Sequence, residues 1–417
     1  MRVFKFGGAS VKDAKGVKNL YKVLKYTGYK DTIIVVSAMG KMTNSFEKLV
    51  DLYFENRIKI DMHLNLIKNF HQKIIDGLFF NYHEAVYSDV KKIFSDLHKF
   101  LKKTNFQNYN FVYDQIVSYG EILSTTIIFN YLKNKGLDIS FIDARNCIKT
   151  DNNYRDSNLD WNLTVKKINI EIEKGKSYIT QGFISSDNKG NTTTLGREGS
   201  DYSASIFAYS LNANDVTIWK DVPGVLNADP RFFSDTTLLT NISYSEAIEL
   251  AFYGASVIHP KTLQPLQRKN IPLYVKSFLN PKMDGTTVSK GVKIKPLIPC
   301  FILKPNQTLL KLSSLDFSFI VEKNISQIFE LLHKYQMKVD MIQNSAISFS
   351  VCVNNKFGRL DDLVKNLNTK FKVDVNENVD LYTVRHFNQK SIDKIKNNGK
   401  KILLEQRANQ IVQFVTI

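Results

Sequence analysis

The sequence contains few cysteines, and their spacing excludes both a fold held by disulfides and a zinc site built from cysteines. Cys147, Cys300 and Cys352 are an odd number, lie far apart and form no Cys-x-x-Cys pair. A chain of this kind has neither a disulfide framework nor a cysteine zinc site. We therefore expect a protein of the reducing cytoplasm, with no metal site built from its own side chains.

Long apolar runs are also missing. No segment approaches the roughly 20 apolar residues that a membrane-spanning helix requires. The opening residues MRVFKFGG lead into a strand pattern and lack the apolar region of a signal peptide. The sequence predicts no membrane partner.

Acidic residues are scarce relative to basic ones. The chain has 57 Lys and Arg against 40 Asp and Glu, a formal net charge of +17. Such an excess can indicate nucleic-acid binding. Here the lysines are spread along the whole chain, without an arginine-rich tract, a zinc knuckle or an aromatic RNA-binding strand. We expect no nucleic-acid partner, and a surface that attracts phosphorylated small molecules.

What is present is an alternation of strands and helices. The length of 417 residues predicts two or three domains, and 43% hydrophobic and 23% charged residues are typical of a globular protein. RVFKF (2–6) and IIVVSA (33–38) read as buried strands, each followed by a small-residue turn and a helix, which is typical of a parallel α/β sheet. Residues 45–135 show helical periodicity and predict a helical insertion. Later strands are expected at 140–144, 178–184, 215–222 and 273–278, giving a domain over residues 1–280.

We predict a linker at 281–300, in a stretch rich in Gly, Pro and Lys, and the order of strands and helices changes after it. Residues 301–378 read as strand, helix, strand, strand, helix, strand. Residues 379–417 repeat this order but are short by one helix and one strand. Two such α+β units in tandem resemble paired ACT domains, although a generic ferredoxin-like tail would give the same pattern.

A glycine turn directly follows the first predicted strand, in KFGGAS (5–10). Two adjacent glycines let backbone N–H groups approach a phosphate, and the helix N-terminus that follows adds positive charge. Lys5 stands where its ammonium group could reach phosphoryl oxygens. The turn is weak evidence alone, and the Walker A pattern is absent.

Three further segments place polar groups beside turns of the same kind. VVSAMGKMTN (35–44) offers Ser37 and Thr43 after the second strand, and SYGEILS (118–124) puts Glu121 at the start of a helix. WKDVPGVLNADPR (219–231) is a polar segment after a strand, as in a nucleotide-binding loop. These segments strengthen the interpretation of the glycine turn as a phosphate-binding site.

The segment TTTLGREGSDYSAS (192–205) joins a lone Arg197 to Asp201 at the start of a helix. Taken alone, Asp201 reads as a helix N-cap and Arg197 as a solvated turn residue. Together with the other motifs, and with ISYSEAIELAFYGASVIHPKT (242–262), the chain resembles the aspartate kinases of the amino-acid-kinase fold along nearly its whole length. The stretch at 246–260 separates these enzymes from acetylglutamate, glutamate, uridylate and carbamate kinases.

The resemblance implies an αβα sandwich with a helical insertion, tandem ACT domains and ATP-dependent phosphorylation of the L-aspartate side chain. The implied aspartate contacts are Ser37, Thr43, Glu121, Arg197 and Ser200. The implied ATP contacts are Lys5, Phe6, Gly7, Gly8, Ser10, Lys220, Asp221, Leu226 and Arg231, with Mg²⁺ bridging the phosphates. Arg197 would hold the α-carboxylate and Glu121 the α-ammonium group. Lys5 and Asp201 are the implied catalytic residues, with Asp201 holding the lysines in position rather than taking a proton.

The chain departs from the usual family pattern at several positions. Glu198 stands where the common GRGGSDY motif has glycine, which costs stability if that position requires a positive φ. Lys220 replaces a threonine, Leu226 replaces a tyrosine, and Ser256 replaces a lysine on the phosphate side. We predict that the missing cation is supplied by one of three nearby residues: Lys220, Arg231 or Lys261.

The ACT resemblance also implies a homodimer and a place for an effector. Val339, Asp340 and Ser345 match positions at which lysine- or threonine-sensitive enzymes contact their effector. The strand–helix turn at 317–326 contains no glycine, so its backbone amides are less free to close on a carboxylate. We predict weak inhibition by lysine or threonine. Two rival functions remain: another acyl-phosphate kinase of this fold, and a regulatory amino-acid-binding protein without activity.

Overall fold

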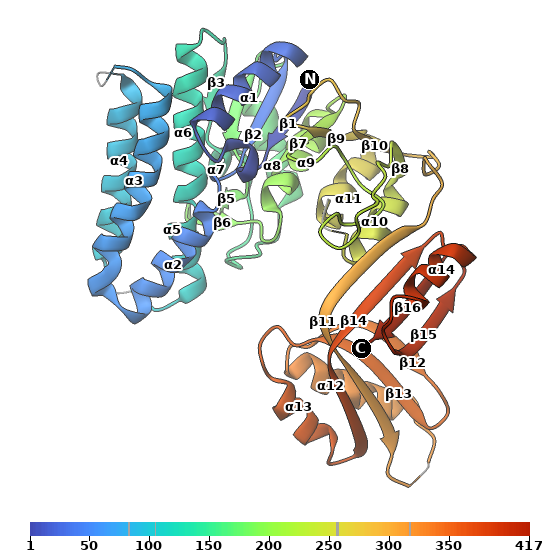
Figure 1. The fold of residues 1–417 in the computed structure, drawn as a ribbon. Helices are drawn as coiled ribbons and strands as arrows, with labels where there is room; N and C mark the ends of the chain where they lie inside the picture. Colours follow the sequence, from blue (N-terminus) through green and yellow to red (C-terminus); the bar gives the residue numbers. More distant parts are fainter. Residues whose placement is uncertain (82–83, 105, 256–257, 317) are drawn as a thin grey trace. The chain divides into compact units, whose positions relative to one another are not determined.

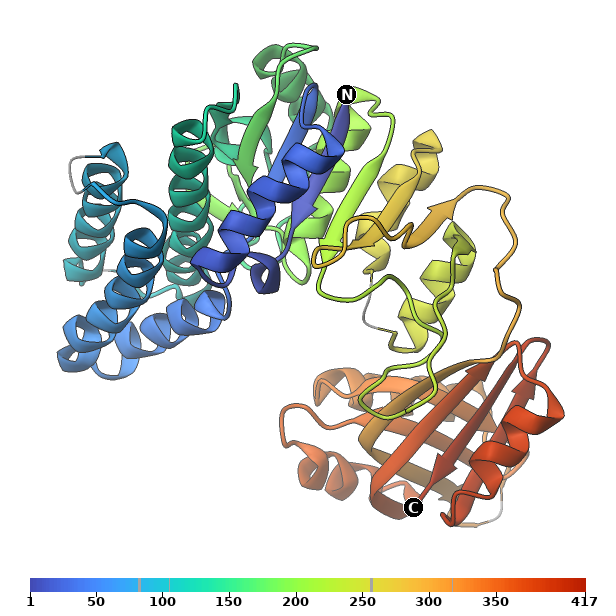
Figure 2. The same ribbon diagram turned by 45° about the horizontal axis from the view of Figure 1, so that its top comes forward.

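The computed structural model spans residues 1–417 and describes all of them except 82–83, 105, 256–257 and 317 (Figures 1 and 2). The chain forms two compact units. The first comprises Met1–Val225, Leu238–Ile248 and Val257–Lys295, and the second comprises Leu226–Thr237, Glu249–Ser256 and Pro296–Ile417.

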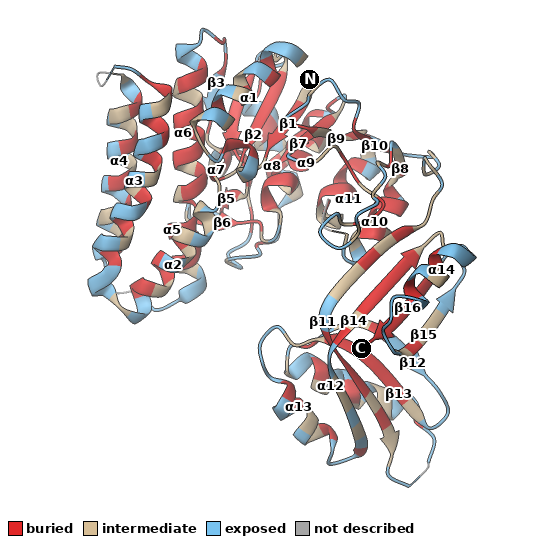
Figure 3. Cartoon of the chain, in the orientation of Figure 1, coloured by how far each residue is buried: buried red, intermediate tan, exposed pale blue. Residues whose placement is uncertain are grey.

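An eight-stranded sheet forms the centre of the first unit, in the order β3-β4-β2-β1-β7-β9-β10-β8. Its strands are β1 (Arg2–Phe6), β2 (Thr32–Val36), β3 (Ser140–Ile142), β4 (Tyr178–Gln181), β7 (Val216–Lys220), β8 (Asn241–Ser243), β9 (Leu273–Ser277) and β10 (Thr286–Ser289). All pairs are parallel except β9 with β10. Every residue of β2 is buried, as expected for a central strand with helices on both faces (Figure 3).

Helices cover this sheet, and a block of helices separates β2 from β3. The block contains α2 (Met42–Glu55), η2 (Arg57–Lys59), α3 (Ile60–Leu78), α4 (Ala85–Lys102), α5 (Tyr109–Val117) and α6 (Tyr119–Asn134). The other helices are η1 (Gly8–Val11), α1 (Ala14–Thr27), α7 (Ala144–Cys147), α8 (Trp161–Glu171), α9 (Gly199–Leu211), α10 (Tyr244–Tyr253) and α11 (Pro260–Lys269). A short antiparallel pair, β5 (Ile184–Ser186) and β6 (Thr192–Thr194), leads into α9.

Part of the segment expected to be a linker belongs to the sheet instead. Strand β10 lies within residues 281–300 and pairs with both β8 and β9. Buried Thr286 fixes it, because its hydroxyl donates to Leu239 O at 2.6 Å and accepts from Val225 N–H at 2.8 Å. A four-residue strand between glycine turns has too short a pattern to be recognised from the sequence.

The second unit contains a six-stranded antiparallel sheet in the order β12-β13-β11-β14-β16-β15. Its strands are β11 (Cys300–Ser314), β12 (Lys338–Asn344), β13 (Ser348–Asn354), β14 (Phe371–Arg385), β15 (Ile402–Ala408) and β16 (Ile411–Thr416). Three helices accompany them: α12 (Glu322–Lys334), α13 (Leu360–Leu367) and α14 (Gln389–Lys396). This is the predicted ferredoxin-like, ACT-like arrangement.

Strands β11 and β14 run through both predicted ACT-like units. The first part of β11, Cys300–Lys304, pairs with Leu381–Arg385, and the register shifts between Lys304 and Leu309. The sequence of the shorter unit, residues 379–417, lacked one strand. The first part of β11 supplies that strand, although it precedes the longer unit along the chain. Pairing across some 80 residues of chain leaves no local sequence pattern, so the sequence could not show it.

Candidate active site

A cavity of about 540 Å³ opens at the carboxyl ends of three parallel strands of the first unit. Lys5 lies in β1, Ser37 follows β2, and Lys220 ends β7. In open α/β sheets, ligands bind at this edge of the strands. The cavity is lined by Lys5, Gly8, Ser37, Ala38, Gly40, Thr43, Tyr113, Glu121, Arg155, Phe183, Gly196, Arg197, Glu198, Gly199, Ser200, Asp201 and Lys220.

The first two turns after the strands pack directly on each other. Gly40 N–H donates to Gly8 O at 3.0 Å. A Cβ on Gly8 would lie 2.8 Å from the carbonyl oxygens of Ala38 and Gly40, so only glycine fits. This contact places the KFGGAS turn and the Ser37–Thr43 segment on the same cavity.

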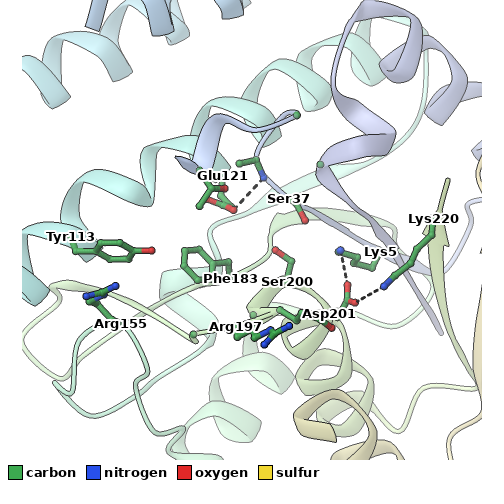
Figure 4. Close-up of a pocket in the computed structure, with 17 residues that line it drawn as sticks. Lys5, Ser37, Tyr113, Glu121, Arg155, Phe183, Arg197, Ser200, Asp201 and Lys220 are labelled. Atoms are coloured by element: carbon green, nitrogen blue, oxygen red, sulfur yellow. Dashed lines mark hydrogen bonds and ion pairs between the residues drawn. The ribbon is translucent and has the colours of Figure 1, made fainter. Parts of the chain in front are cut away.

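Two lysines converge on Asp201 at one end of the cavity (Figure 4). Lys5 Nζ lies 2.6 Å from Asp201 Oδ1, and Lys220 Nζ lies 3.7 Å from Oδ2. The Asp201 side chain is only 3% exposed. Burial alone would raise the pKa of Asp201, but the two ammonium groups outweigh burial and hold this pKa below its usual value. Asp201 is thus an ionised anchor for two cations.

Glu121 is a buried carboxyl in the first turn of α6. Its Oε1 accepts the Ala38 N–H at 3.2 Å, while its Oε2 is buried without a hydrogen-bond partner among the described residues. Burial raises the pKa of Glu121 to about 8. A buried carboxyl that lines a cavity with one oxygen unused is suited to bind a cation there.

The turn between β6 and α9 carries Arg197 and Glu198. Arg197 is exposed and forms no ion pair within the described part of the chain. Glu198 has a φ of 53° and precedes the helix, so the position does require a left-handed backbone. Its Oε2 is buried and has no partner in the described ranges. The substitution of glutamate for glycine therefore costs strain and adds a carboxylate to the cavity.

The structure brings together most, but not all, of the residues predicted to bind aspartate or ATP or to act in catalysis. Those that line the cavity are Lys5, Gly8, Ser37, Thr43, Glu121, Arg197, Ser200, Asp201 and Lys220. Gly7, Ser10 and Asp221 are not among its lining residues. The Phe6 side chain lies in the core and stacks on Trp219. Side chains alternate along a strand, so the Phe6 side chain points away from the side that Lys5 faces, and a contact from Phe6 to ATP stays a prediction that only its backbone could meet.

Among the described residues, the lining of this cavity includes none of the other predicted nucleotide and cation positions. Leu226 and Arg231 belong to the second unit, where the Arg231 guanidinium binds the Asp229 carboxylate. Lys261 pairs with Asp156. Ser256 lies outside the described residues. Of the three cations proposed to replace a missing lysine, Lys220 alone lines the cavity.

The sequence did not indicate three side chains of the lining. Tyr113, Arg155 and Phe183 all lie in or next to segments that lack a motif. Arg155 and Phe183 have φ values of 75° and 67°, in the region that favours glycine. A positive φ at a large residue is a property of the folded loop, and no residue type reveals it in advance.

The predicted effector residues lie on or beside β12 of the second unit. Val339 is partly buried, and Ser345 is exposed and shares a hydrogen bond with Ser348 at 2.7 Å. The Asp340 side chain is 5% exposed and pairs with Lys304 at 2.7 Å. A lysine of the chain itself therefore already occupies the carboxylate that was expected to receive an effector ammonium group.

No group of three or more His, Cys, Asp or Glu side chains in the described ranges could hold a metal ion. Among the helices that the structure describes, none has the length and apolar character needed to cross a membrane.

Comparisons with known proteins agree on one family. The model of the amino acid kinase family matches residues 1–277. Lysine-sensitive aspartokinase 3 of Escherichia coli is 31% identical over 356 residues, 84% of this chain and 78% of that protein. An aspartokinase of Chlamydia pneumoniae is 30% identical over 355 residues, 83% of this chain and 76% of that protein.

Solved structures give the same result for the fold. The E. coli aspartokinase III structure in complex with aspartate and ADP has a TM-score of 0.83 at 26% identity, covering 100% of this chain and 96% of that one. The same enzyme in complex with lysine and aspartate also gives 0.83, at 27% identity, with coverage of 100% and 95%.

Proposed function

Since this chain belongs to the aspartokinases of the amino acid kinase family, we propose that it transfers the γ-phosphoryl group of ATP to the side-chain carboxylate of L-aspartate. The product is 4-phospho-L-aspartate, the first intermediate on the route to lysine, threonine and methionine. The observation that carries the proposal is one cavity with two lysines at one end and, on its walls, a buried carboxyl and a guanidinium that has no ion pair among the described residues.

The acceptor amino acid binds through its two backbone charges. Glu121, with its unused Oε2, receives the α-ammonium group, and Arg197 holds the α-carboxylate as a planar two-pronged donor. The hydroxyls of Ser37, Thr43 and Ser200 supply weaker polar contacts. This arrangement leaves the side-chain carboxylate to face the lysine end.

The reaction requires positioning rather than proton removal. An aspartate carboxylate, with a reference pKa near 3.9, is already ionised at neutral pH and needs no general base. Two anions must instead be held in line while charge accumulates on the transferring group. Lys5 and Lys220 provide the positive charge, and Asp201 fixes both ammonium groups before substrate arrives.

Nucleotide phosphates fit the glycine turn beside these lysines. Gly7 and Gly8 follow β1 directly after Lys5 and Phe6 and form the N-terminus of η1, where backbone amides are suited to bind phosphate oxygens. Contacts from Ser10, Asp221, Leu226 and Arg231 to the nucleotide remain predictions.

Mg²⁺ is compatible with this donor set. It usually binds through one or two carboxylates together with substrate phosphates and therefore needs no cluster of protein ligands. The carboxylate that fits is Glu198, whose buried Oε2 lacks a partner among the described residues and which lines the cavity. When bound, the ion would neutralise phosphate charge.

We also propose that the protein is cytoplasmic and that it forms a homodimer, which associates through the ACT-like unit. A six-stranded sheet with β12 and β15 at its edges leaves backbone groups that a second copy can pair with.

The test is a purified-protein screen with ATP and aspartate, glutamate or N-acetylglutamate, with the acyl phosphate trapped by hydroxylamine. We expect hydroxamate from aspartate only. Formation from glutamate or acetylglutamate instead would favour another acyl-phosphate kinase of this fold. No product from any acceptor would favour a regulatory binding protein.

A further inference from the structure

Arg155 lines the cavity but is not required by the roles described so far. Figure 4 shows it beside Tyr113, across the cavity from Lys5 and Lys220. It therefore lies at the end opposite the phosphoryl-transfer cations. The inference below rests on the proposed aspartate kinase function and concerns the acceptor half of that site.

The backbone at Arg155 is held in a strained conformation. Its φ of 75° favours glycine, and an arginine there costs stability. The Asp114 carboxylate holds this turn in place, because both of its oxygens accept the Arg155 N–H at 3.1 Å. Strain of this kind, fixed by a buried group, is often found at binding sites.

Asp114 also ties the Arg155 turn to the strand that leads to Arg197. The Thr194 N–H and hydroxyl donate to Asp114 at 3.0 and 2.7 Å. Ser157 N–H donates to Thr194 O at 3.0 Å. In addition, a Cβ on Gly196 would lie 3.4 Å from Arg155 O, so the two arginine-bearing turns are in direct contact.

The Arg155 side chain is oriented by aromatic rings rather than by an acid. Its guanidinium carbon lies 4.4 Å from the centroid of the Tyr113 ring and 5.6 Å from that of Tyr109. The Tyr113 hydroxyl donates to Glu47 at 2.7 Å, which fixes that ring. Within the described residues, Arg155 forms no ion pair, so its charge is available to a ligand.

We propose that Arg155 is a second acceptor-binding guanidinium, which contacts the α-carboxylate of the bound amino acid together with Arg197. A carboxylate has room for about four hydrogen bonds and can accept from two guanidinium groups at once. Arg155 thereby makes the site selective for acceptors with a free α-carboxylate and closes the end of the cavity opposite the lysines.

The test compares wild type with Arg155→Gly, which suits the backbone, and Arg155→Lys, which keeps the charge but not the planar fork. Substrates are L-aspartate and its α-carboxamide, which retains the reacting side-chain carboxylate. We expect Arg155→Gly to raise the aspartate KM about 10- to 100-fold and leave the ATP KM within about twofold. Arg155→Lys should fall between the two.

The ratio of the carboxamide KM to the aspartate KM separates contact from structural support. It should be large in wild type and clearly smaller in Arg155→Gly, because one of the two guanidinium contacts to the α-carboxylate is then already lost and only that of Arg197 remains. A matched control is Asn270→Gly, another exposed residue with positive φ, at the end of α11. It should leave every KM unchanged.

An unchanged aspartate KM, or an unchanged KM ratio, in a folded Arg155→Gly protein would overturn the inference while leaving the proposed function intact. Wild type that phosphorylates no aspartate overturns both. If Arg155→Gly does not fold, Arg155→Lys tests the inference instead. An aspartate KM equal to that of wild type would then show that the planar guanidinium of Arg155 does not bind the α-carboxylate.

Discussion

Glu121→Gln tests whether the buried carboxyl of the cavity is the ammonium-binding group. Burial raises the pKa of Glu121 from 4.5 to about 8 in the folded protein. That rise means that ionised Glu121 lowers the free energy of unfolding by about 5 kcal/mol, at about 1.4 kcal/mol for each pKa unit. The penalty falls on the ionised form, so it is absent at low pH and develops as the pH rises.

The pH dependence of the folding stability follows from how tightly the folded and unfolded states bind the Glu121 proton. Between pH 4.5 and 8 the folded protein holds the Glu121 proton more tightly than the unfolded chain, so stability falls as the pH increases through this range. Glutamine cannot ionise and avoids this loss. From pH 6 to pH 8, we expect the stability of Glu121→Gln to gain about 2–3 kcal/mol relative to wild type, measured by urea unfolding.

The affinity of wild type for aspartate should rise with pH over the range in which its stability falls. Only about 1% of Glu121 is ionised at pH 6, and about half at pH 8, when the pKa is 8. If the carboxylate form binds the α-ammonium group, aspartate affinity in wild type increases by about 50-fold between these pH values. Titration calorimetry should show this rise, and Glu121→Gln should bind weakly with no comparable pH dependence.

The exposed Glu55 at the end of α2 provides the control, because Glu55→Gln should leave both profiles unchanged. A flat pH profile of aspartate affinity in wild type, or a Glu121→Gln protein that binds aspartate as wild type does, would refute the assignment. Stability curves that run parallel for wild type and Glu121→Gln would refute the shifted pKa itself.

Three further predictions concern single residues. Arg197→Ala should raise the aspartate KM far more than the ATP KM, by a factor equivalent to about 2–4 kcal/mol, and equal changes in both constants would contradict the proposed contact. Glu198→Gly should raise the stability by about 1 kcal/mol in a thermal melt, because φ is 53° there, and a lower Tm would show that its side chain stabilises the turn. Lysine and threonine should inhibit only weakly in steady-state assays, because Lys304 already pairs with Asp340. Sub-millimolar inhibition that disappears in Asp340→Ala would disprove this.

Local features of the sequence were sufficient for the fold class and for part of the site. The predicted α/β unit and the ACT-like tail are confirmed, because strand periodicity, glycine turns and helix starts are properties of neighbouring residues. The glycine turn at Gly7–Gly8 and the carboxyl of Glu121 could be identified in the same way, since each lies next to a strand end or a helix start.

The tertiary structure alone decided what these residues contact. The sequence places Glu121 at a helix start, but only packing removes its Oε2 from water and raises its pKa. Arg155 lies in no motif, and its role depends on Asp114, which is 41 residues away along the chain. Similarly, Lys220 qualifies as a phosphate-side cation only because β7 pairs with β1 and places it beside Asp201. Burial, pairing and convergence of charges depend on distances between segments remote in sequence, and no local pattern encodes those distances.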